Sequence, residues 1–259
     1  MAEVERPVTI ATVSGKGGVG KTALTIGLGY ALKELGYAVG LCDLDLESSS
    51  LGDALGISRD NLEMTEKIEP VEVNGVKAVS LALFPDEGFE DVPTLIDDER
   101  VYALVGQMFR SVNWGDLDFL CIDFPPGTGP ELRGLIKQKV DGLILVTATQ
   151  RLSEMPVRRL VRMAREEYGL NIIGVVSNNP YAIDGTDSGK AIAERYGLPL
   201  LATIPWDATI AAAMDLRTPM DTQHFVPIAK ALEAQFFPER VKKAKPKRIR
   251  KRKAKTNAK

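Results

Sequence analysis

Residues 14–22 read S-G-K-G-G-V-G-K-T, a glycine-rich stretch with two lysines. An apolar run at Val8–Val13 precedes it and predicts a buried strand, while a helical pattern follows at Thr22–Leu35 and stops before Gly36. The backbone N–H groups of such a turn converge on phosphate oxygens at the start of a helix. The stretch meets the phosphate-loop pattern G-x-x-x-x-G-K-[ST] at four residues, Gly15, Gly20, Lys21 and Thr22. The sequence therefore predicts a site for a nucleoside triphosphate, which we take to be ATP.

The roles within this loop follow from what phosphoryl transfer requires, which is positioning and charge neutralisation. We assign Lys21 to the β- and γ-phosphates and the hydroxyl of Thr22 to Mg²⁺. The residues that we expect around the nucleotide are Gly15, Gly17, Gly18, Val19, Gly20, Lys21, Thr22 and Ala23. The alternative is a tight glycine turn without a ligand, which the flanking strand and helix make much less favourable.

Three aspartates follow apolar strands and belong with the phosphate loop. Asp43 and Asp45 end the second predicted strand, and we expect both side chains on the side where α/β sheets bind ligands. Asp123 ends a later strand; we expect Asp43 and Asp123 to hold Mg²⁺ together with Thr22, and Asp45 to orient the attacking water. Taken alone, an aspartate at a strand end is commonly a turn residue or a helix cap.

The segment after Asp123 reads F-P-P-G-T-G and has the character of a switch. We expect the N–H of Gly127 to contact the γ-phosphate, so that loss of this phosphate would release the segment.

Strand-like and helix-like segments alternate along the chain. Strands are predicted at Val8–Val13, Ala38–Asp43, Ala78–Leu83, Phe119–Asp123, Gly142–Thr147, Ile172–Ser177 and Leu200–Ile204. Helices are predicted at Thr22–Leu35, Asp97–Ser111, Pro130–Lys137, Ser153–Tyr168, Thr186–Tyr196 and His224–Phe236. The strands are rich in Val, Ile and Leu without polar alternation, which is typical of strands covered on both faces. This order predicts an α/β fold with a doubly wound, mainly parallel sheet and helices on both faces. The acidic segment Asp86–Asp98 is expected to be a surface loop.

Charge divides the chain at residue 239. Residues 240–259 hold 12 of the 33 Lys and Arg and none of the 35 Asp and Glu, so the rest of the chain carries an excess of 14 acids. We predict one P-loop ATPase domain at 1–239 and a basic, disordered tail at 240–259. The two cysteines lie in apolar runs, no segment is long and apolar enough to span a membrane, and residues 1–7 lack a secretory signal, so we expect a cytoplasmic protein with no membrane partner.

The loop K-G-G-V-G-K-T at residues 16–22 resembles that of the deviant Walker A P-loop NTPases, the MinD/ParA/Mrp group. The resemblance covers roughly residues 7–235 and is strongest to the Mrp (ApbC-type) branch, which serves iron–sulfur cluster assembly. It rests on N-G-V-K-A-V-S at 74–80, V-N-W-G-D-L-D-F-L at 112–120, D-F-P-P-G-T-G at 123–129, G-V-V-S-N at 174–178 and I-P-W-D at 204–207.

The resemblance implies further roles. Lys16 resembles the signature lysine that reaches the partner's phosphates across a nucleotide-sandwich homodimer, and so joins Lys21 and Asp45 among the expected catalytic residues. Asn178, Pro205 and Asp207 would face the adenine. The alternatives are a solvated loop lysine for Lys16 and a strand-end turn residue for Asn178.

The chain also departs from the Mrp pattern. The family commonly carries C-x-x-C just after the segment that matches 175–178, whereas residues 179–187 read N-P-Y-A-I-D-G-T-D. The family's D-x-D-x-Y-G-P-S is D-L-D-L-E-S-S-S at 43–50, and the aspartate expected after Gly129 is Pro130. Because thiolates are the usual ligands of iron–sulfur clusters, we expect no stable cluster on this chain.

Two functions remain open from the sequence. One is a dimeric Mrp-like ATPase that assists metallocofactor assembly, with assembly proteins as partners. The other is a ParA- or MinD-like positioning or partitioning ATPase that attaches to nucleic acid through residues 240–259. The tail has few large apolar residues and a proline, so membrane attachment through an amphipathic helix is disfavoured. The simplest alternative is a tail that aids solubility or docks on acidic protein.

Overall fold

The computed structural model describes residues 6–45, 50–61, 63–80, 98–148, 154–179 and 187–244. The strands of its main sheet are β1 (Val8–Val13), β2 (Val39–Asp43), β5 (Val71–Val73), β6 (Val76–Ser80), β7 (Phe119–Asp123), β8 (Gly142–Ala148), β9 (Ile172–Asn179) and β10 (Leu200–Pro205). The helices are α1 (Lys21–Glu34), α2 (Ser50–Leu55), α3 (Asp98–Ser111), α4 (Pro130–Ile136), α5 (Glu154–Arg162), α6 (Ser188–Tyr196), α7 (Ala208–Leu216), α8 (Val226–Phe236) and α9 (Pro238–Ala244). A π-helical turn, Met163–Glu167, continues α5.

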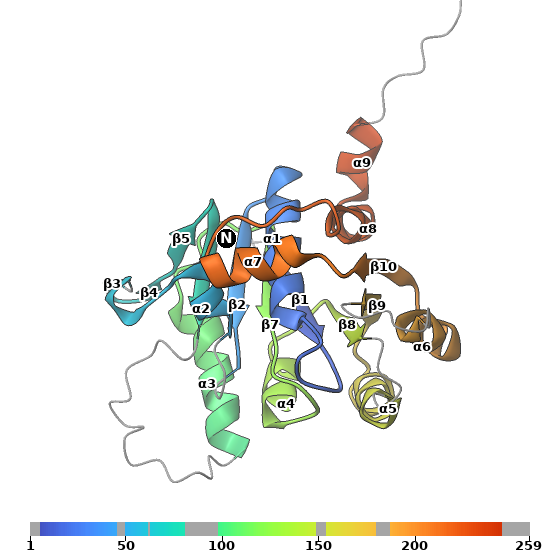
Figure 1. Cartoon of the computed structure of the whole chain (residues 1–259). Coiled ribbons are helices and arrows are strands. Elements are labelled where there is room, and N and C mark those ends of the chain that lie inside the picture. Colours follow the sequence, from blue (N-terminus) through green and yellow to red (C-terminus); the bar gives the residue numbers. More distant parts are fainter. Residues whose placement is uncertain are drawn as a thin grey trace, which may run out of the picture.

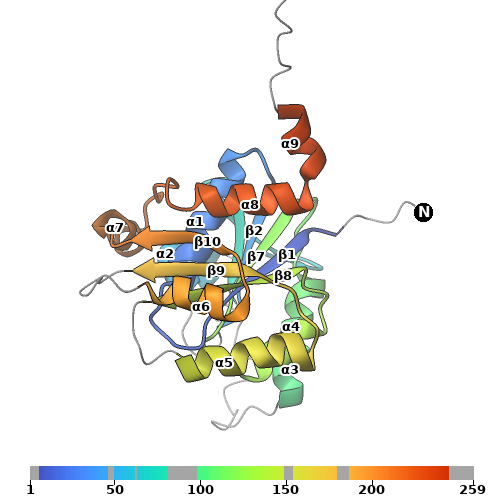
Figure 2. The same cartoon turned by 90° about the vertical axis from the view of Figure 1, so that its right-hand side faces the viewer.

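The sheet lies between two layers of helices (Figures 1 and 2). Its strand order is β10-β9-β8-β1-β7-β2-β6-β5, and all neighbours are parallel except the edge pair β5–β6. Helices α1, α2, α7 and α8 pack on one face, and α3, α4, α5 and α6 pack on the other. The predicted doubly wound, mainly parallel α/β fold is confirmed.

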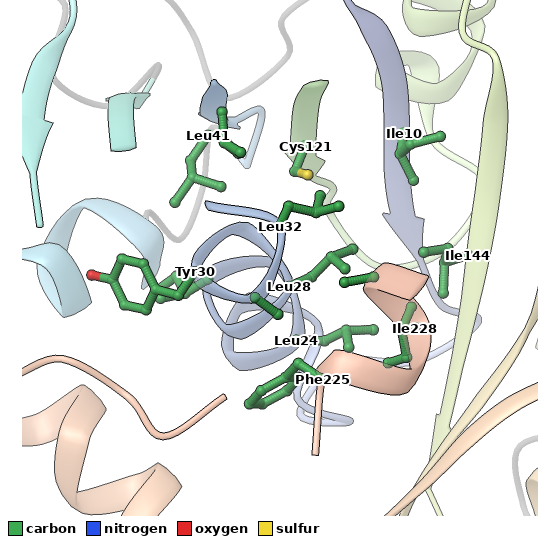
Figure 3. Close-up of a cluster of buried hydrophobic side chains, with 14 of the residues drawn as sticks. Ile10, Leu24, Leu28, Tyr30, Leu32, Leu41, Cys121, Ile144, Phe225 and Ile228 are labelled. Carbon is green, nitrogen blue, oxygen red and sulfur yellow. The ribbon is translucent and has the colours of Figure 1, made fainter. Parts of the chain in front are cut away.

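Burial on both sides explains why the strands lack polar alternation. Every residue of β2, β7 and β8 is buried, as expected for strands covered by helices on each face. Helix α1 is buried over most of its circumference, because α8 covers the side that the sheet does not. Figure 3 shows Leu24, Leu28 and Leu32 of α1 among side chains from the strands, with Phe225 and Ile228 nearby.

Several elements were not predicted. The edge hairpin β5–β6 turns at Asn74 and Gly75, which both have positive φ (50° and 76°). Asn-Gly between two β-rich runs is a strong hairpin signal, so the sequence did contain the information for β5. Helices α2 and α7 and the short antiparallel pair β3 (Glu63–Met64) and β4 (Ile68–Glu69) were also missed. The predicted strand at 78–83 begins earlier, at Val76, and residues 81–83 lie outside the described residues.

The predicted boundary at residue 239 falls inside α9. The Arg240 guanidinium stacks on the ring of Tyr37, 4.2 Å from its centroid, and Tyr37 also contacts Phe119 and Phe237. Tyr37 and Phe119 lie where β2 and β7 begin. Helix α9 is therefore anchored at the amino ends of these strands, whereas the phosphate loop follows the carboxyl end of β1 (Figure 1). The first residues of the predicted tail are therefore helical, while residues 245–259 lie outside the described residues.

Residues 86–97 of the predicted surface loop lie outside the described residues. Its last residue, Asp98, begins α3. Within the described ranges, no helix has the length and apolar character needed to cross a membrane.

Candidate functional site

The phosphate loop joins the end of β1 to the first turn of α1, and two of its glycines are required by geometry. A Cβ on Gly15 would lie 2.7 Å from the Cβ and backbone of the first turn of α5, at Pro156 and Val157. Gly20 has φ of 89° and directly precedes α1. This left-handed conformation favours glycine. The loop thus lies between the first turns of α1 and α5. The sequence pattern predicted the helix after the loop, whereas the contact with α5 was not predicted.

Asn178, at the end of β9, is brought to the loop across 159 positions of sequence. Its Nδ2 donates to the carbonyl oxygen of Val19 at 2.9 Å, and a Cβ on Gly20 would lie 2.2 Å from the same nitrogen. Val19 is buried and fixes the middle of the loop, while Gly17 and Gly18 are exposed. The loop side chain Ser14 is fully buried and donates to the carbonyl of Lys16 at 2.7 Å.

The predicted metal residues Thr22 and Asp123 meet directly. Thr22 Oγ1 donates to Asp123 Oδ2 at 2.6 Å, although 101 positions separate them. Asp123 and Asp43 are register neighbours on β7 and β2, so their carboxylates approach from adjacent strands. This arrangement follows from the sheet order, because the carboxyl ends of parallel strands share one edge.

Burial shifts the pKa values of the charged groups around the phosphate loop. Desolvation raises the pKa of Asp123 to about 7, and the negative charge of Asp43 adds to this rise. The hydrogen bond from Thr22 and the charge of Lys21 oppose it. Burial lowers the pKa of Lys21, and the neighbouring carboxylates, led by Asp123, act against that shift. The aspartates and Lys21 therefore lie close enough to interact, as expected for a site that handles phosphate and a cation.

The residues present fit Mg²⁺. Asp123 Oδ1 is buried and has no hydrogen-bond partner, an arrangement that leaves one oxygen for a cation or its water. Among the described residues, no group of three or more His, Cys, Asp or Glu could hold a metal without other ligands. Mg²⁺ characteristically takes one or two protein oxygens and completes its shell with waters and substrate phosphates. Thr22 and Asp123 would hold it in this way.

Asp43 and Asp45 differ from the sequence expectation. β2 ends at Asp43, and the N–H of Asp45 donates to Asp43 Oδ1 at 2.9 Å, so Asp45 lies in a turn and does not continue the strand. Asp43 is fully buried, and its Oδ2 accepts a hydrogen bond from Ser80 Oγ at 3.2 Å. The expectation that Asp43 and Asp45 lie on one strand, with their side chains on the same side, was therefore wrong, because only Asp43 belongs to the strand. Asp45 still lies near Lys21, since its charge acts on the lysine's pKa.

The N–H of Gly127 donates to the carbonyl of Ser14 at 2.9 Å. The segment after β7 is thereby tied to the first residue of the phosphate loop. Contact with a γ-phosphate, which stays a prediction, requires this N–H to exchange one acceptor for another. Gly127 has φ of 94°, so only glycine fits this turn without strain.

The residues expected around the adenine lie at the ends of β9 and β10. Pro205 pairs with Asn179 in the last register step between these strands. Asp207 caps α7: its Oδ1 accepts from the N–H and hydroxyl of Thr209 at 2.9 and 2.6 Å, and its Oδ2 lies 3.2 Å from Nε2 of His224. Asp207 thus has a structural role as a helix cap, and its contact with a base stays a prediction.

The two cysteines lie on opposite faces of the sheet. Cys42 is level with Ile122 and Cys121 is level with Leu41, so the thiols point to different sides, and each packs in a different core cluster. Burial raises the pKa of Cys121 to about 12 and raises that of Cys42 as well. Neither thiol is positioned to ligate a cluster together with the other.

One feature was missed from the sequence. A cleft of about 900 Å³ opens between α4 and α5 beside the loop; the described residues around it include Gly15 and Gly127 in its wall and four arginines. We call it the arginine cleft; its arginines are Arg133, Arg158, Arg159 and Arg162. Three of these lie within five residues of α5, a signal visible in the sequence at R-R-L-V-R, but only the packing of α5 shows that they border the loop.

Comparisons with known proteins agree with this geometry. Residues 5–236 match the family described as ParA, NUBPL iron-transfer P-loop NTPase. The chain is 34% identical over 246 residues to an iron–sulfur cluster carrier protein of Aquifex aeolicus, covering 86% of this chain and 66% of that protein. It is 31% identical to an iron–sulfur cluster carrier protein of Pyrococcus horikoshii, covering 86% and 82%.

Solved structures share the fold. MinD of Pyrococcus horikoshii, complexed with Mg-ADP, has a TM-score of 0.67 at 24% identity and covers 89% of this chain and 97% of its own. Cobyrinic acid a,c-diamide synthase of Mycobacterium smegmatis, with a bound ATP analogue and magnesium, has a TM-score of 0.63 at 25% identity and covers 90% and 97%. The chain therefore belongs to the ParA family of P-loop NTPases, within the MinD/ParA/Mrp group that its phosphate loop resembles.

Proposed function

We propose that the protein is a Mg²⁺-dependent ATPase that works as a nucleotide-switched homodimer. The observation that carries this proposal is the direct contact between Thr22 and Asp123 beneath the phosphate loop, with an unpartnered oxygen on Asp123. Mg²⁺, when bound, would neutralise charge on the phosphates. Lys21 adds positive charge at the start of α1, whose N–H groups favour anions.

The switch we propose uses the hydrogen bond between Gly127 and Ser14. If a γ-phosphate takes over the N–H of Gly127, the bond to Ser14 breaks and the segment 124–129 adopts a second position. Hydrolysis would remove that acceptor and restore the first arrangement. A difference of one backbone hydrogen bond is enough to bias such a segment, since hydrogen bonds to charged groups contribute about 1.5–3 kcal/mol.

Lys16 is the residue that we assign to the partner's phosphates. We expect Mg-ATP to drive dimerisation, and Lys16→Ala to weaken the dimer at least about tenfold, because a charge facing phosphate is lost. Sedimentation of the hydrolysis-deficient Asp45→Ala protein with ATP, with and without Lys16→Ala, measures this, and ATP turnover of the unaltered chain is followed in parallel.

Lys230→Ala is the matched control, since Lys230 is an exposed lysine on α8. A dimer that is indifferent to Lys16 would remove this residue from the mechanism. Absence of Mg²⁺-dependent ATP turnover in the unaltered chain would refute the proposed function itself.

The process that we propose for this ATPase is metallocofactor assembly, carried out without a cluster held by its own thiols. The relatives named above are iron–sulfur cluster carriers, and the family is described by iron transfer. Two cysteines on opposite faces of a buried sheet are the only thiols of this chain. A role as an ATP-driven partner of assembly proteins is therefore favoured over a role as the carrier.

We expect the purified protein to bind no stoichiometric iron–sulfur cluster, because its thiols are buried and on opposite faces of the sheet. Anaerobic reconstitution followed by iron and sulfide analysis tests this, with Cys42→Ala and Cys121→Ala prepared alongside. A stable cluster that is lost in either variant would restore the carrier function.

The alternative function is attachment to nucleic acid by the basic tail, as in a ParA- or MinD-like partitioning ATPase. The observation that favours it is the run of basic residues without an acid at 240–259. Because α9 is anchored opposite the phosphate loop, two tails of a dimer joined through its loops would leave from opposite ends. Avidity would then require a long nucleic acid that passes both ends.

A chain ending at Ala244 keeps α9 and the contact of Arg240 with Tyr37, yet lacks nine of the twelve basic residues of the tail. We expect the full chain to bind duplex DNA or RNA nonspecifically, with affinity falling roughly 10³-fold between about 50 and 200 mM salt if about six phosphates are engaged. Equal binding by the two chains would exclude the tail as the attachment site.

A further inference from the structure

The arginine cleft has a charge opposite to that of the surrounding protein. Among the described residues, its lining carries four arginines and one acidic residue, Glu167, whereas the chain before residue 240 has an excess of 14 acids. A positively charged hollow in a protein body with an excess of acids concentrates field lines and attracts anionic ligands. Nothing in the ATPase chemistry described above uses these arginines.

Two of the arginines have only weak ion pairs. Arg133 Nη1 lies 3.0 Å from Asp98 Oδ2, and Arg162 Nε lies 3.6 Å from Glu166 and 3.9 Å from Glu167. The side chains of Arg133 and Arg162 are 46% and 68% exposed, so water screens these pairs and they contribute little. The carboxylates of a ligand can therefore replace Asp98, Glu166 and Glu167 as partners of these two arginines.

The other two arginines lie on α5, one helical turn before Arg162. Arg158 and Arg159 are exposed on α5, and no ion pair joins either of them to another described residue. Arg158 and Arg162 are one helical turn apart, about 6 Å along the axis. Met155, 73% exposed, adds an apolar contact at the preceding turn.

This spacing suits an extended acidic peptide. Alternate residues of an extended chain point to the same side and are about 6.8 Å apart, close to the rise between Arg158 and Arg162. A guanidinium forms paired hydrogen bonds with a carboxylate in one plane. Nucleic acid fits less well, because no aromatic residue is among the described residues that line the cleft, so base stacking has no partner there. The excess of acids in the chain before residue 240 also repels a long polyanion.

We propose that the arginine cleft is a docking site for an extended acidic segment of a partner protein. The cleft shares Gly15 with the phosphate loop and Gly127 with the segment after β7, so an occupant lies against the residues that surround the nucleotide. Its use in the ATPase cycle rests on the proposed function, but the docking itself does not require nucleotide.

The test measures binding of a short fluorescent peptide, in which glutamates alternate with alanines, to the full-length protein without nucleotide. We expect Arg158→Glu to weaken binding about tenfold, because an attraction becomes a repulsion at the contact. Arg110→Glu makes the same change of charge on α3, outside the cleft lining. It should change the affinity for the peptide less than about twofold. The basic tail is present in every variant and contributes equally.

A second variant reverses the sign of the effect. Glu167→Gln removes the negative charge that the described lining residues carry, so it should strengthen peptide binding about threefold. A merely structural role for these residues does not predict a gain. A peptide with glutamine in place of glutamate should not bind.

Equal weakening by Arg158→Glu and Arg110→Glu, or weaker binding by Glu167→Gln, would overturn the proposal. So would an oligonucleotide that binds more tightly than the peptide and is lost with Arg158→Glu. ATP binding is measured on the same samples. Peptide binding without ATP binding would refute the proposed function and support the docking site. ATP binding without peptide binding would refute the docking site and leave the proposed function unaffected.

Discussion

Replacing Lys21 by alanine is expected to abolish tight ATP binding, with a loss of at least about 100-fold in affinity. Lys21 is 8% exposed and is the first residue of α1. Its side chain is therefore held in place by burial at the start of the helix and does not move freely on the surface. It lies among three carboxylates, Asp43, Asp45 and Asp123, which its charge partly offsets. Without Lys21 the site presents negative charge to a polyanionic ligand.

The measurement is calorimetric titration with Mg-ATP, and Lys230→Ala serves again as the control for loss of a lysine. Thermal unfolding of each variant is recorded, because removing a buried cation from a group of aspartates also affects stability. Lys21→Gln, which keeps a polar side chain of similar length without the charge, should lose affinity to a similar extent. Near-normal affinity in both Lys21 variants would show that the phosphates lie elsewhere.

Replacing Asp45 by alanine is expected to leave ATP binding intact within a few-fold and to lower turnover by about 10²–10⁴. The turn that follows β2 places Asp45 beside Asp43, whose carboxylate accepts its N–H, and near Lys21. We assign no phosphate contact to Asp45, so its loss should affect the step in which water attacks and not nucleotide affinity.

Single-turnover hydrolysis and equilibrium binding, measured on one preparation, separate the two effects. Asp215→Ala, at an exposed position of α7, is the matched control for loss of a carboxylate. If Asp45→Ala hydrolyses ATP at the rate of the unaltered chain, the water-orienting role is wrong. If it fails to bind ATP, Asp45 has a role in building the site itself.

The local parts of the site could be predicted from the sequence. A phosphate loop is encoded within nine residues, because the glycines that permit its conformation, the lysine and the hydroxyl are consecutive in the chain. The apolar runs likewise predicted the seven parallel strands, since burial on both faces leaves a clear compositional signal. The end of β2 was less predictable: whether Asp45 continues the strand depends on a hydrogen bond from its own N–H to Asp43.

Contacts between distant segments were decided by the tertiary structure alone. Asn178 reaches Val19, and Asp123 reaches Thr22, because the strand order brings the ends of β9 and β7 to the same edge as β1. The register of β2 against β7 places the two thiols on opposite faces, which the sequence spacing of Cys42 and Cys121 does not reveal.

The sequence by itself determined that this chain has a phosphate loop, a doubly wound α/β sheet and no C-x-x-C pair. Only the tertiary structure decided that α5 packs against Gly15 and turns its arginines into a cleft beside that loop. The physical reason is the range of the interactions. Backbone conformation and helix starts depend on neighbouring residues, whereas a cleft depends on how helices far apart in the chain pack on one face of the sheet.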